Sequence, residues 1–160
     1  AYAEYVRRSE KPLPLLIADL GEQPAEAILR EIGEPRLRGM LRLAGYIPNS
    51  DLPAIYNRAS AFLYTSLRES FGIPQLEAMA CGTPVVTSAT SAIPEVAGQG
   101  AILVDPTDPT AIADALLRLE TDAEFRAGQV AYGLERVKQF SWEKTARHLL
   151  ALYESLGKTN

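Results

Sequence analysis

Glu69 and Glu77 are the residues of this chain whose types and spacing best suit the binding of a polar ligand. An ionised carboxylate only accepts hydrogen bonds, so it suits the hydroxyl groups of a polyol. Gly72 lies between the two acids and lets a ligand approach the backbone closely, because glycine has no Cβ. The pattern therefore predicts that the two glutamates flank one pocket for a ligand rich in hydroxyl groups.

The residues around this pair indicate a strand, a loop and a short helix. The apolar run 61–64 predicts a buried strand, and Pro74 suits the first turn of a helix, where a missing N–H group costs nothing. Gly82 favours the end of that helix. We expect free N–H groups at the helix start, which give a partial positive charge suited to phosphate or sugar oxygens. These groups belong to Phe71, Gly72, Ile73 and Gln75.

Residues 66–86 follow the order Ser-x-x-Glu-x-Phe-Gly-x-Pro-x-x-Glu-Ala-Met-Ala-Cys-Gly-Thr-Pro-Val-Val. This order closely resembles the signature of retaining group 1 (family 4) glycosyltransferases with the GT-B fold. The resemblance implies that Glu69, the candidate catalytic residue, contacts the donor sugar and that Glu77 holds the ribose hydroxyls of the nucleotide. The ordinary alternative is an acid near a helix start for Glu77 and a solvated loop acid for Glu69. The other donor-binding residues implied by the resemblance are Ser66, Phe71, Gly72 and Ile73.

The loop that follows the expected strand 40–44 carries two further candidate donor contacts, Tyr46 and Ile47. The resemblance implies that this loop borders the base of the nucleotide. The alternative is that Tyr46 covers the edge of the sheet. Asn49 or Ser50 is expected to cap the helix that follows.

The rest of the chain predicts a parallel, doubly wound α/β sheet of the Rossmann-like kind, with helices on both faces. Apolar runs that suit strands alternate with helical patterns, and the ligand of such a sheet binds outside the carboxyl ends of the strands. Tyr46, Glu69 and Ser88 all follow expected strands, so they should lie on that edge. The five expected strands are 13–18, 40–44, 61–64, 84–87 and 101–104.

The last third of the chain predicts packing helices over 110–119 and 123–140, and a final helix that Ser141 caps. The lone His148 has no visible catalytic partner and is expected at the surface. Cys81 is expected to be a small residue that closes a helix. The apolar residues expected to pack the final helix are Trp142, Leu149, Leu152 and Leu156.

Composition excludes several classes of partner. The chain has 160 residues, 47% of them hydrophobic, a net charge of -4 and a pI near 5.1, which suit one globular domain without an electrostatic footprint for nucleic acid or anionic membrane. The single cysteine and the absence of a long apolar span or signal peptide indicate the cytoplasm. No cluster has the spacing of metal ligands, so neither a bound metal nor a cofactor is expected.

The resemblance covers nearly the whole chain and implies that residues 1–160 are a single nucleotide-sugar-binding domain, the C-terminal half of a GT-B enzyme. Its first strand is expected to precede Ala1, and a missing N-terminal domain is expected to supply the site for an unknown acceptor. The full-length protein would then transfer a sugar with retention, and the isolated chain would be inactive. The alternatives are a GT-B nucleotide-sugar epimerase or hydrolase, and a non-catalytic nucleotide-sugar-binding or structural module. A receiver domain built on Asp19 is disfavoured, because no lysine lies at the end of an expected strand.

Overall fold

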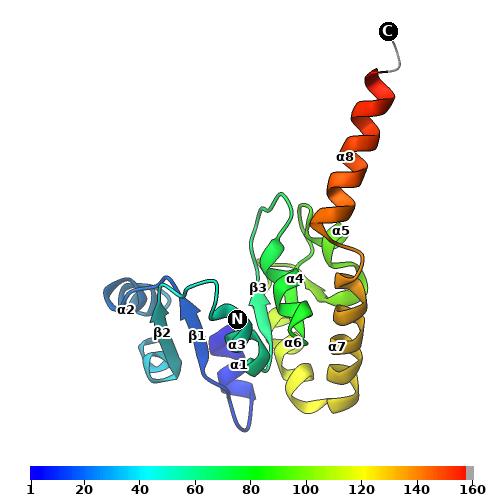
Figure 1. Ribbon diagram of the computed structural model, residues 1–160. Helices are drawn as coiled ribbons and strands as arrows, with labels where there is room; N and C mark the ends of the chain where they lie inside the picture. The colour runs from blue at the N-terminus through cyan, green and yellow to red at the C-terminus, as the bar shows by residue number, and fades with distance from the viewer. Residues whose placement is uncertain (158–160) are drawn as a thin grey trace.

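The computed structural model describes residues 1–157, and Figure 1 shows the order of its elements in space. Two segments of 3-10 helix, η1 and η2, join the regular elements. In chain order the elements are α1 (Tyr2–Arg8), β1 (Leu15–Ala18), α2 (Glu22–Glu31), η1 (Pro35–Met40), β2 (Leu41–Gly45), α3 (Leu52–Arg58), β3 (Phe62–Tyr64), α4 (Ile73–Ala80), β4 (Val85–Ser88), α5 (Ile93–Ala97), η2 (Gly98–Gly100), β5 (Ile102–Val104), α6 (Pro109–Thr121), α7 (Ala123–Val137) and α8 (Trp142–Gly157).

The five strands are all parallel and fall into two hydrogen-bonded sheets. One sheet pairs β1 with β2, and the other has the order β3-β4-β5. The α/β fold class with parallel strands is confirmed, and the strands lie where the sequence predicts them to within a few residues. Within residues 1–157 the outer edge of β1 and that of β3 pair with no strand, so the sheet that the sequence predicts as one is divided.

The three-stranded sheet is buried on both faces. All four residues of its central strand β4 are buried, which only a sheet covered on both sides allows. Val85 packs in one cluster with Ala78 and Met79 of α4, whereas Val86 packs in another with Ile112 and other residues of α6. Successive side chains of a strand point to opposite faces, so these two clusters are the two cores of a doubly wound sheet.

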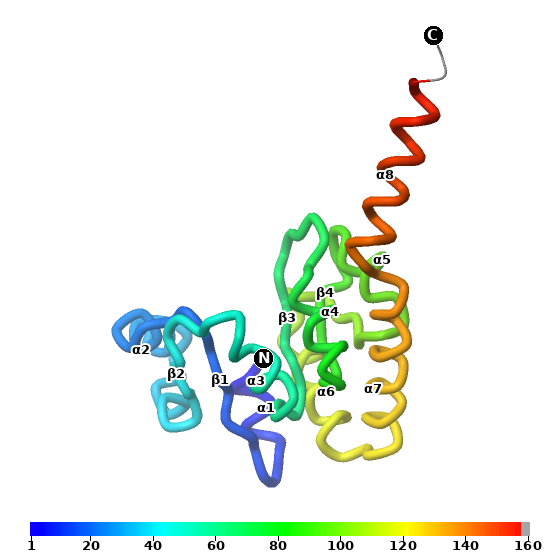
Figure 2. Tube along the Cα trace, in the orientation of Figure 1, coloured from blue at the N-terminus to red at the C-terminus, as the bar shows by residue number. Residues whose placement is uncertain are grey.

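The two-stranded sheet has a smaller core of its own. Its buried residues are Leu29, Leu37 and Leu41, and residues of α1 pack against them. The same helix also reaches the larger half of the molecule, where Arg8 lies 2.5 Å from Asp114 of α6. Helix α1 therefore joins the two halves, as the tube in Figure 2 also shows.

The starts of α6 and α3 differ in how they are capped. Asp108 caps α6 through its side chain, which accepts hydrogen bonds from the N–H groups of Thr110 and Ala111. Helix α3 instead begins after Asp51, and no side chain caps it, so the cap predicted at Asn49 or Ser50 is wrong. The reason is a turn in which the Asp51 N–H donates to the carbonyl of Pro48 and moves the helix start beyond Ser50.

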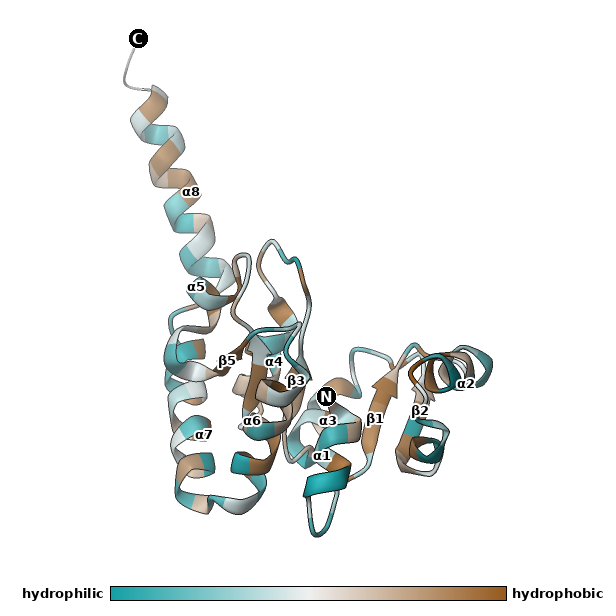
Figure 3. Cartoon of the chain, turned by 180° about the vertical axis from the view of Figure 1, so that it is seen from behind, coloured by the Kyte–Doolittle hydropathy of each residue, from teal (hydrophilic) through white to brown (hydrophobic). Residues whose placement is uncertain are grey.

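Helix α8 projects from the body of the molecule (Figure 1). Ser141 caps it as predicted, by accepting a hydrogen bond of 3.1 Å from the Lys144 N–H. None of its residues is buried, and Trp142 is 82% exposed. The prediction that its apolar residues pack is therefore wrong for residues 1–157, and Figure 3 shows the apolar bands that remain in the open.

In the described part of the chain, none of the helices combines the length and the apolar character that crossing a membrane requires.

Candidate functional site

The start of α4 is built around Gly72, whose φ of 85° lies in the left-handed region. A Cβ at this position would lie 2.9 Å from Nε2 of Gln75, so the turn requires glycine for its space as well as for its φ. Ile73 and Pro74 follow as the first residues of the helix. The loop and helix predicted from the Gly-x-Pro pattern are thus confirmed.

Three of the four N–H groups expected to be free at this helix start donate to no acceptor among residues 1–157, namely those of Phe71, Gly72 and Ile73. The fourth, that of Gln75, donates to the carbonyl of Gly72 over 3.3 Å, so its prediction as a free donor is wrong. The left-handed turn at Gly72 brings that carbonyl round to face the first turn of the helix. The remaining donors still give the helix start the partial positive charge that suits anionic oxygens.

Glu69 lies in the loop between β3 and α4 and is half-buried. The hydroxyl of Tyr64, at the end of β3, donates to Oε1 of Glu69 over 2.6 Å. Burial, followed by this contact with Glu69, raises the pKa of Tyr64 to about 12, so the hydroxyl keeps its proton at neutral pH. Ser91 contacts the backbone of Glu69, donating to its carbonyl over 2.6 Å.

Glu77 is on α4 and lines a cavity of about 270 Å³ that Glu69 does not reach. The hydroxyl of Tyr56 lies 3.4 Å from Oε2 of Glu77, which is long for a hydrogen bond between oxygens. Burial, followed by the charge of Glu77, raises the pKa of Tyr56 to about 12. The other lining residues of this cavity are Asn49, Leu52, Pro53, Ala80 and Cys81.

That both glutamates flank one pocket stays a prediction, because Glu77 lines this cavity and Glu69 does not. Glu77 faces helix α3, where Tyr56 lies, whereas Glu69 faces the end of β3. A row of three aromatic rings joins the two places: the rings of Tyr56 and Phe62 are 5.2 Å apart, and those of Phe62 and Tyr64 are 5.8 Å apart. The two acids thus contact the two end rings of one aromatic row.

The loop after β2 contributes differently from what the sequence suggests. Tyr46 is 78% exposed, so the alternative in which it covers the sheet edge is wrong. Ile47 is half-buried, and a contact of either residue with a nucleotide base stays a prediction. Asn49, from the same loop, lines the cavity of Glu77.

The sequence analysis missed two side chains of the site, because it named only the backbone N–H of Gln75 and did not name Tyr56. Gln75 is fully buried, donates to the Phe71 carbonyl over 3.4 Å, and leaves its Oε1 without a partner. Its only signal in the sequence is a polar residue on the inner side of a short apolar helix. Tyr56 has no such signal, because 21 residues separate it from Glu77.

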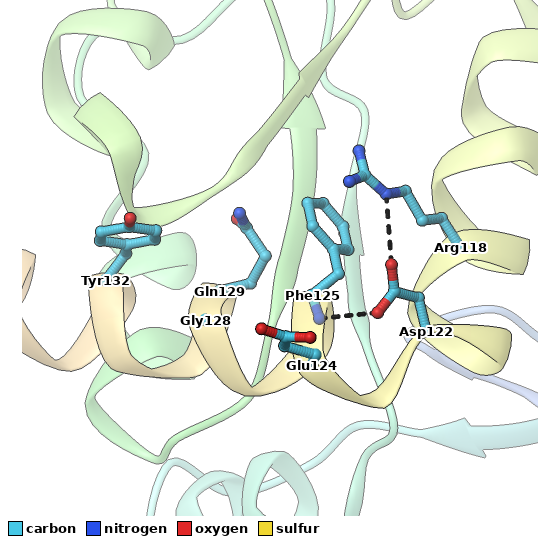
Figure 4. A pocket seen from close by; sticks show the side chains of 7 residues that line it. All are labelled: Arg118, Asp122, Glu124, Phe125, Gly128, Gln129 and Tyr132. Carbon is cyan, nitrogen blue, oxygen red and sulfur yellow. Dashed lines mark hydrogen bonds and ion pairs between the residues drawn. The ribbon is translucent and has the colours of Figure 1, made fainter.

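A larger recess, of about 350 Å³, lies away from this motif, on α6 and α7 (Figure 4). The guanidinium of Arg118 lies 3.5 Å from the ring centre of Phe125, and Asp122 approaches the same guanidinium at 4.0 Å. No residue of a loop at the carboxyl end of a strand lines this recess, and we assign no ligand to it.

Among residues 1–157 no group of three or more His, Cys, Asp or Glu side chains is placed to hold a metal ion. Cys81 closes α4, as predicted, and His148 is exposed. That the protein needs neither metal nor cofactor stays a prediction.

The fold and the site together define a class of protein, an α/β domain that presents acids and free helix N–H groups at the carboxyl end of a parallel sheet, where such folds bind their ligands. The chain belongs to the group 1 glycosyl transferases, whose family pattern matches residues 1–136. Its architecture is the GT-B type found in its structural neighbours.

Three proteins illustrate the similarity. The chain is 36% identical over 143 residues to O-antigen chain mannosyltransferase B of Escherichia coli, a match of 89% of this chain and 38% of that protein. It superposes on sucrose-phosphate synthase from Thermosynechococcus elongatus with a TM-score of 0.79 and 29% identity, over 99% of this chain and 42% of the other. It superposes on Anabaena Alr3699/HepE in complex with UDP-glucose with a TM-score of 0.80 and 19% identity, over 95% of this chain and 43% of the other. The chain thus spans about two fifths of these proteins' length.

Proposed function

We propose that the full-length protein is a retaining, family 4 glycosyltransferase and that residues 1–160 form its C-terminal, donor-binding domain. The observation that carries this proposal is the arrangement around the start of α4, where free N–H groups lie between Glu69 and Glu77. A nucleotide-diphosphate sugar combines the hydroxyl groups that carboxylates bind with the anionic oxygens that a helix start binds. The UDP-glucose complex of the Anabaena neighbour supports this class of ligand.

Glu69 is the residue that we assign to the donor sugar, as the group that orients its hydroxyls at the reacting carbon. Phe71, Gly72 and Ile73 donate their N–H groups to oxygens of the sugar and of the leaving diphosphate. Donors fixed in advance toward developing negative charge lower the barrier to departure of the diphosphate, because they need no rearrangement during the reaction. Ser66, whose hydroxyl contacts the Arg68 carbonyl at 3.3 Å, completes this group.

Glu77 is assigned to the ribose. Its carboxylate lines the 270 Å³ cavity together with Asn49 and Tyr56, so the cavity offers an acceptor group, an amide and a phenol to a bound sugar ring. The exposed Tyr46 and the half-buried Ile47 precede Asn49 in the same loop and are assigned to the base.

The division of the sheet supports the view that this domain is completed by chain outside the 160 residues. A parallel strand between the unpaired edges of β1 and β3 would join the two sheets into one, with the strand order of a doubly wound nucleotide-binding fold. The chain's share of its relatives' length leaves room for such a strand and for a second domain that binds the acceptor. We therefore propose that the isolated 160 residues do not turn over donor. A cytoplasmic location stays part of this proposal.

The test is calorimetric titration of the full-length protein with UDP, GDP and ADP, and with UDP- and GDP-sugars. We expect one base to be preferred, and Glu77→Ala to weaken binding of that nucleoside diphosphate about tenfold or more, since it removes charged acceptors of two hydroxyl groups. Glu124→Ala, at an exposed position of α7, is the matched control and should bind as the unaltered protein does. Equal affinity of the Glu77→Ala variant and the control would remove the ribose assignment, and absence of any nucleotide binding would refute the function.

A further inference from the structure

The loop that carries Glu69 is held by side-chain hydroxyl groups from the segment that follows β4. The backbone pairing of β3 with β4 ends at Tyr64 and Thr87, but the two segments that follow these strands continue side by side (Figure 2). From there on the hydroxyls of the second segment donate to backbone carbonyls of the first. The contacts are Thr87 to Tyr64 at 2.9 Å, Ser88 to Ser66 at 2.6 Å, Thr90 to Leu67 at 3.4 Å and Ser91 to Glu69 at 2.6 Å.

Ser91 is the last contact of this series and differs from the others in two ways. Its Oγ also accepts from the N–H of Glu69 over 3.2 Å, so one hydroxyl holds both backbone groups of that residue. Its φ is 59°, a left-handed conformation that residues other than glycine seldom adopt. A glycine would adopt this conformation freely but would have no hydroxyl, so the serine is strained where it makes the contact.

Tyr64 holds the other end of the same residue. The O–H···O distance of 2.6 Å to the Glu69 carboxylate is that of a strong hydrogen bond to a charged acceptor. The ring itself is fixed, because it stacks on Phe62 with an interplanar angle of 17°. The hydroxyl is therefore a donor at a fixed place, and the carboxylate of Glu69 has one of its oxygens set by it.

We propose that Tyr64 and Ser91 are positioning residues, which hold the carboxylate and the backbone of Glu69 in the place from which it binds the donor sugar. This inference rests on the proposed function, because it assigns Glu69 to the sugar. Neither residue touches the donor itself. Their effect is to keep a loop acid in one arrangement before the donor arrives, so that binding does not have to order it.

The experiment compares two affinities of the full-length protein by calorimetry: that for the preferred nucleoside diphosphate alone and that for the corresponding nucleotide sugar. Tyr64→Phe removes only a hydroxyl and keeps the stacked ring. Ser91→Gly removes the hydroxyl and relaxes the left-handed φ. For each variant we expect the affinity for the nucleotide sugar to fall about tenfold, as for a lost hydrogen bond to a charged or positioned group, and the affinity for the diphosphate to change less than about twofold.

Two further variants separate positioning from a structural effect. Tyr132→Phe removes a hydroxyl from an exposed tyrosine on α7 and should leave both affinities unchanged. Ser91→Ala loses the same hydroxyl as Ser91→Gly but keeps a Cβ at φ 59°, so it should lose the same sugar affinity while being less stable to heat. Amide hydrogen exchange at Glu69 should quicken in both Ser91 variants, because its N–H loses its acceptor.

The outcomes distinguish this proposal from the function on which it rests. If the unaltered protein binds neither nucleotide nor nucleotide sugar, the proposed function is refuted and the positioning role with it. If it binds both, but each variant loses the two affinities by the same factor or loses neither, only the positioning role is refuted. A selective loss of the nucleotide sugar in Tyr64→Phe and Ser91→Gly supports the proposal.

Discussion

The molecule has two halves, one built on β3, β4 and β5 and the other on β1 and β2. Both pair their strands in parallel, but they bury the strands to different extents. All four residues of β4 are buried, whereas β1 alternates half-buried with exposed residues, and Leu16 on it is 47% exposed. The Glu69–Glu77 motif belongs to the first half, between strand β3 and the fully buried strand β4. The site therefore lies on the three-stranded sheet, which helices cover on both faces. The half with the two-stranded sheet, called the open half below, still presents apolar surface.

Replacing a large buried side chain by alanine should show the largest difference in stability between the two halves. Met79 on α4 is 1% exposed and packs against Gly100 of η2 and Gly133 of α7, so Met79→Ala leaves a cavity in the close-packed core. We expect it to lower the free energy of unfolding by about 4 kcal/mol, and Leu29→Ala of the smaller core by about 2 kcal/mol. Urea denaturation measures both. A greater loss in Leu29→Ala than in Met79→Ala would contradict the comparison.

Close packing in the larger half should also show at its glycines. A Cβ at Gly133 would lie 3.2 Å from Cγ of Met79 and 3.4 Å from the carbonyl of Gly100, so Gly133→Ala should destabilise the fold by about 1–3 kcal/mol. Gly128 lies on the same helix with open space around its Cβ position, and Gly128→Ala should stabilise by about 0.5–1 kcal/mol. Thermal denaturation measures whether each variant is more or less stable than the unaltered protein. Equal effects of the two would mean that α7 does not pack as tightly as the distances indicate.

The helix caps give a smaller contrast. Asp108→Ala removes two hydrogen bonds at the start of α6 and should cost about 1 kcal/mol. Helix α2, in the open half, begins after Gly21 without a side-chain cap, and the φ of Gly21, -80°, suits other residues. Gly21→Asp should therefore stabilise by a few tenths of a kcal/mol. The prediction fails if denaturant midpoints of the two variants move in the same direction.

Two tyrosines of the larger half should make the stability of the fold depend on pH in alkali. The pKa of Tyr56 and that of Tyr64 are each raised from 10.0 to about 12 in the folded chain, so folding holds their protons. The stability that this difference provides is complete below pH 10 and is lost as the pH rises to 12. The double variant Tyr56→Phe, Tyr64→Phe should lose less stability over that interval than the unaltered protein, as urea midpoints at several pH values would show. The prediction would be contradicted if the midpoints of the variant and of the unaltered protein fell equally between pH 10 and pH 12. Burial also raises the pKa of Tyr2 and Tyr5 in the open half, which the variant retains.

Much of the fold was predictable because its signals are local. Pro74 and Gly82 mark the ends of α4 to within a residue or two, and Asp108 caps α6 as its place before a proline suggests. The alternation of apolar runs with helical patterns likewise gives the parallel strands. Local signals do not reveal which strands pair, so the separation of β1 from β3 appears only in three dimensions.

The site was predictable in its acids but not in what holds them. The contacts of Ser91 with Glu69 join residues 22 positions apart, and no pattern in the sequence indicates a hydroxyl that replaces a strand's N–H group. The turn at Gly72 was expected, but its carbonyl accepts a hydrogen bond from the N–H of Gln75. That N–H is therefore not free to bind a ligand at the helix start. For α8 the spacing of apolar residues shows which side is apolar, but not whether a surface lies against it.

Helix α8 has a thermodynamic consequence of its own. A segment of 16 residues is about 24 Å long, and helices of that length without tertiary contacts are only marginally stable in water. Within residues 1–157 its order comes from the Ser141 cap and a pair such as Glu143 with Arg147, both of which are exposed. Its helicity should therefore decline gradually on warming, before the cooperative unfolding of the body, and should gain cooperativity only when its apolar side is covered.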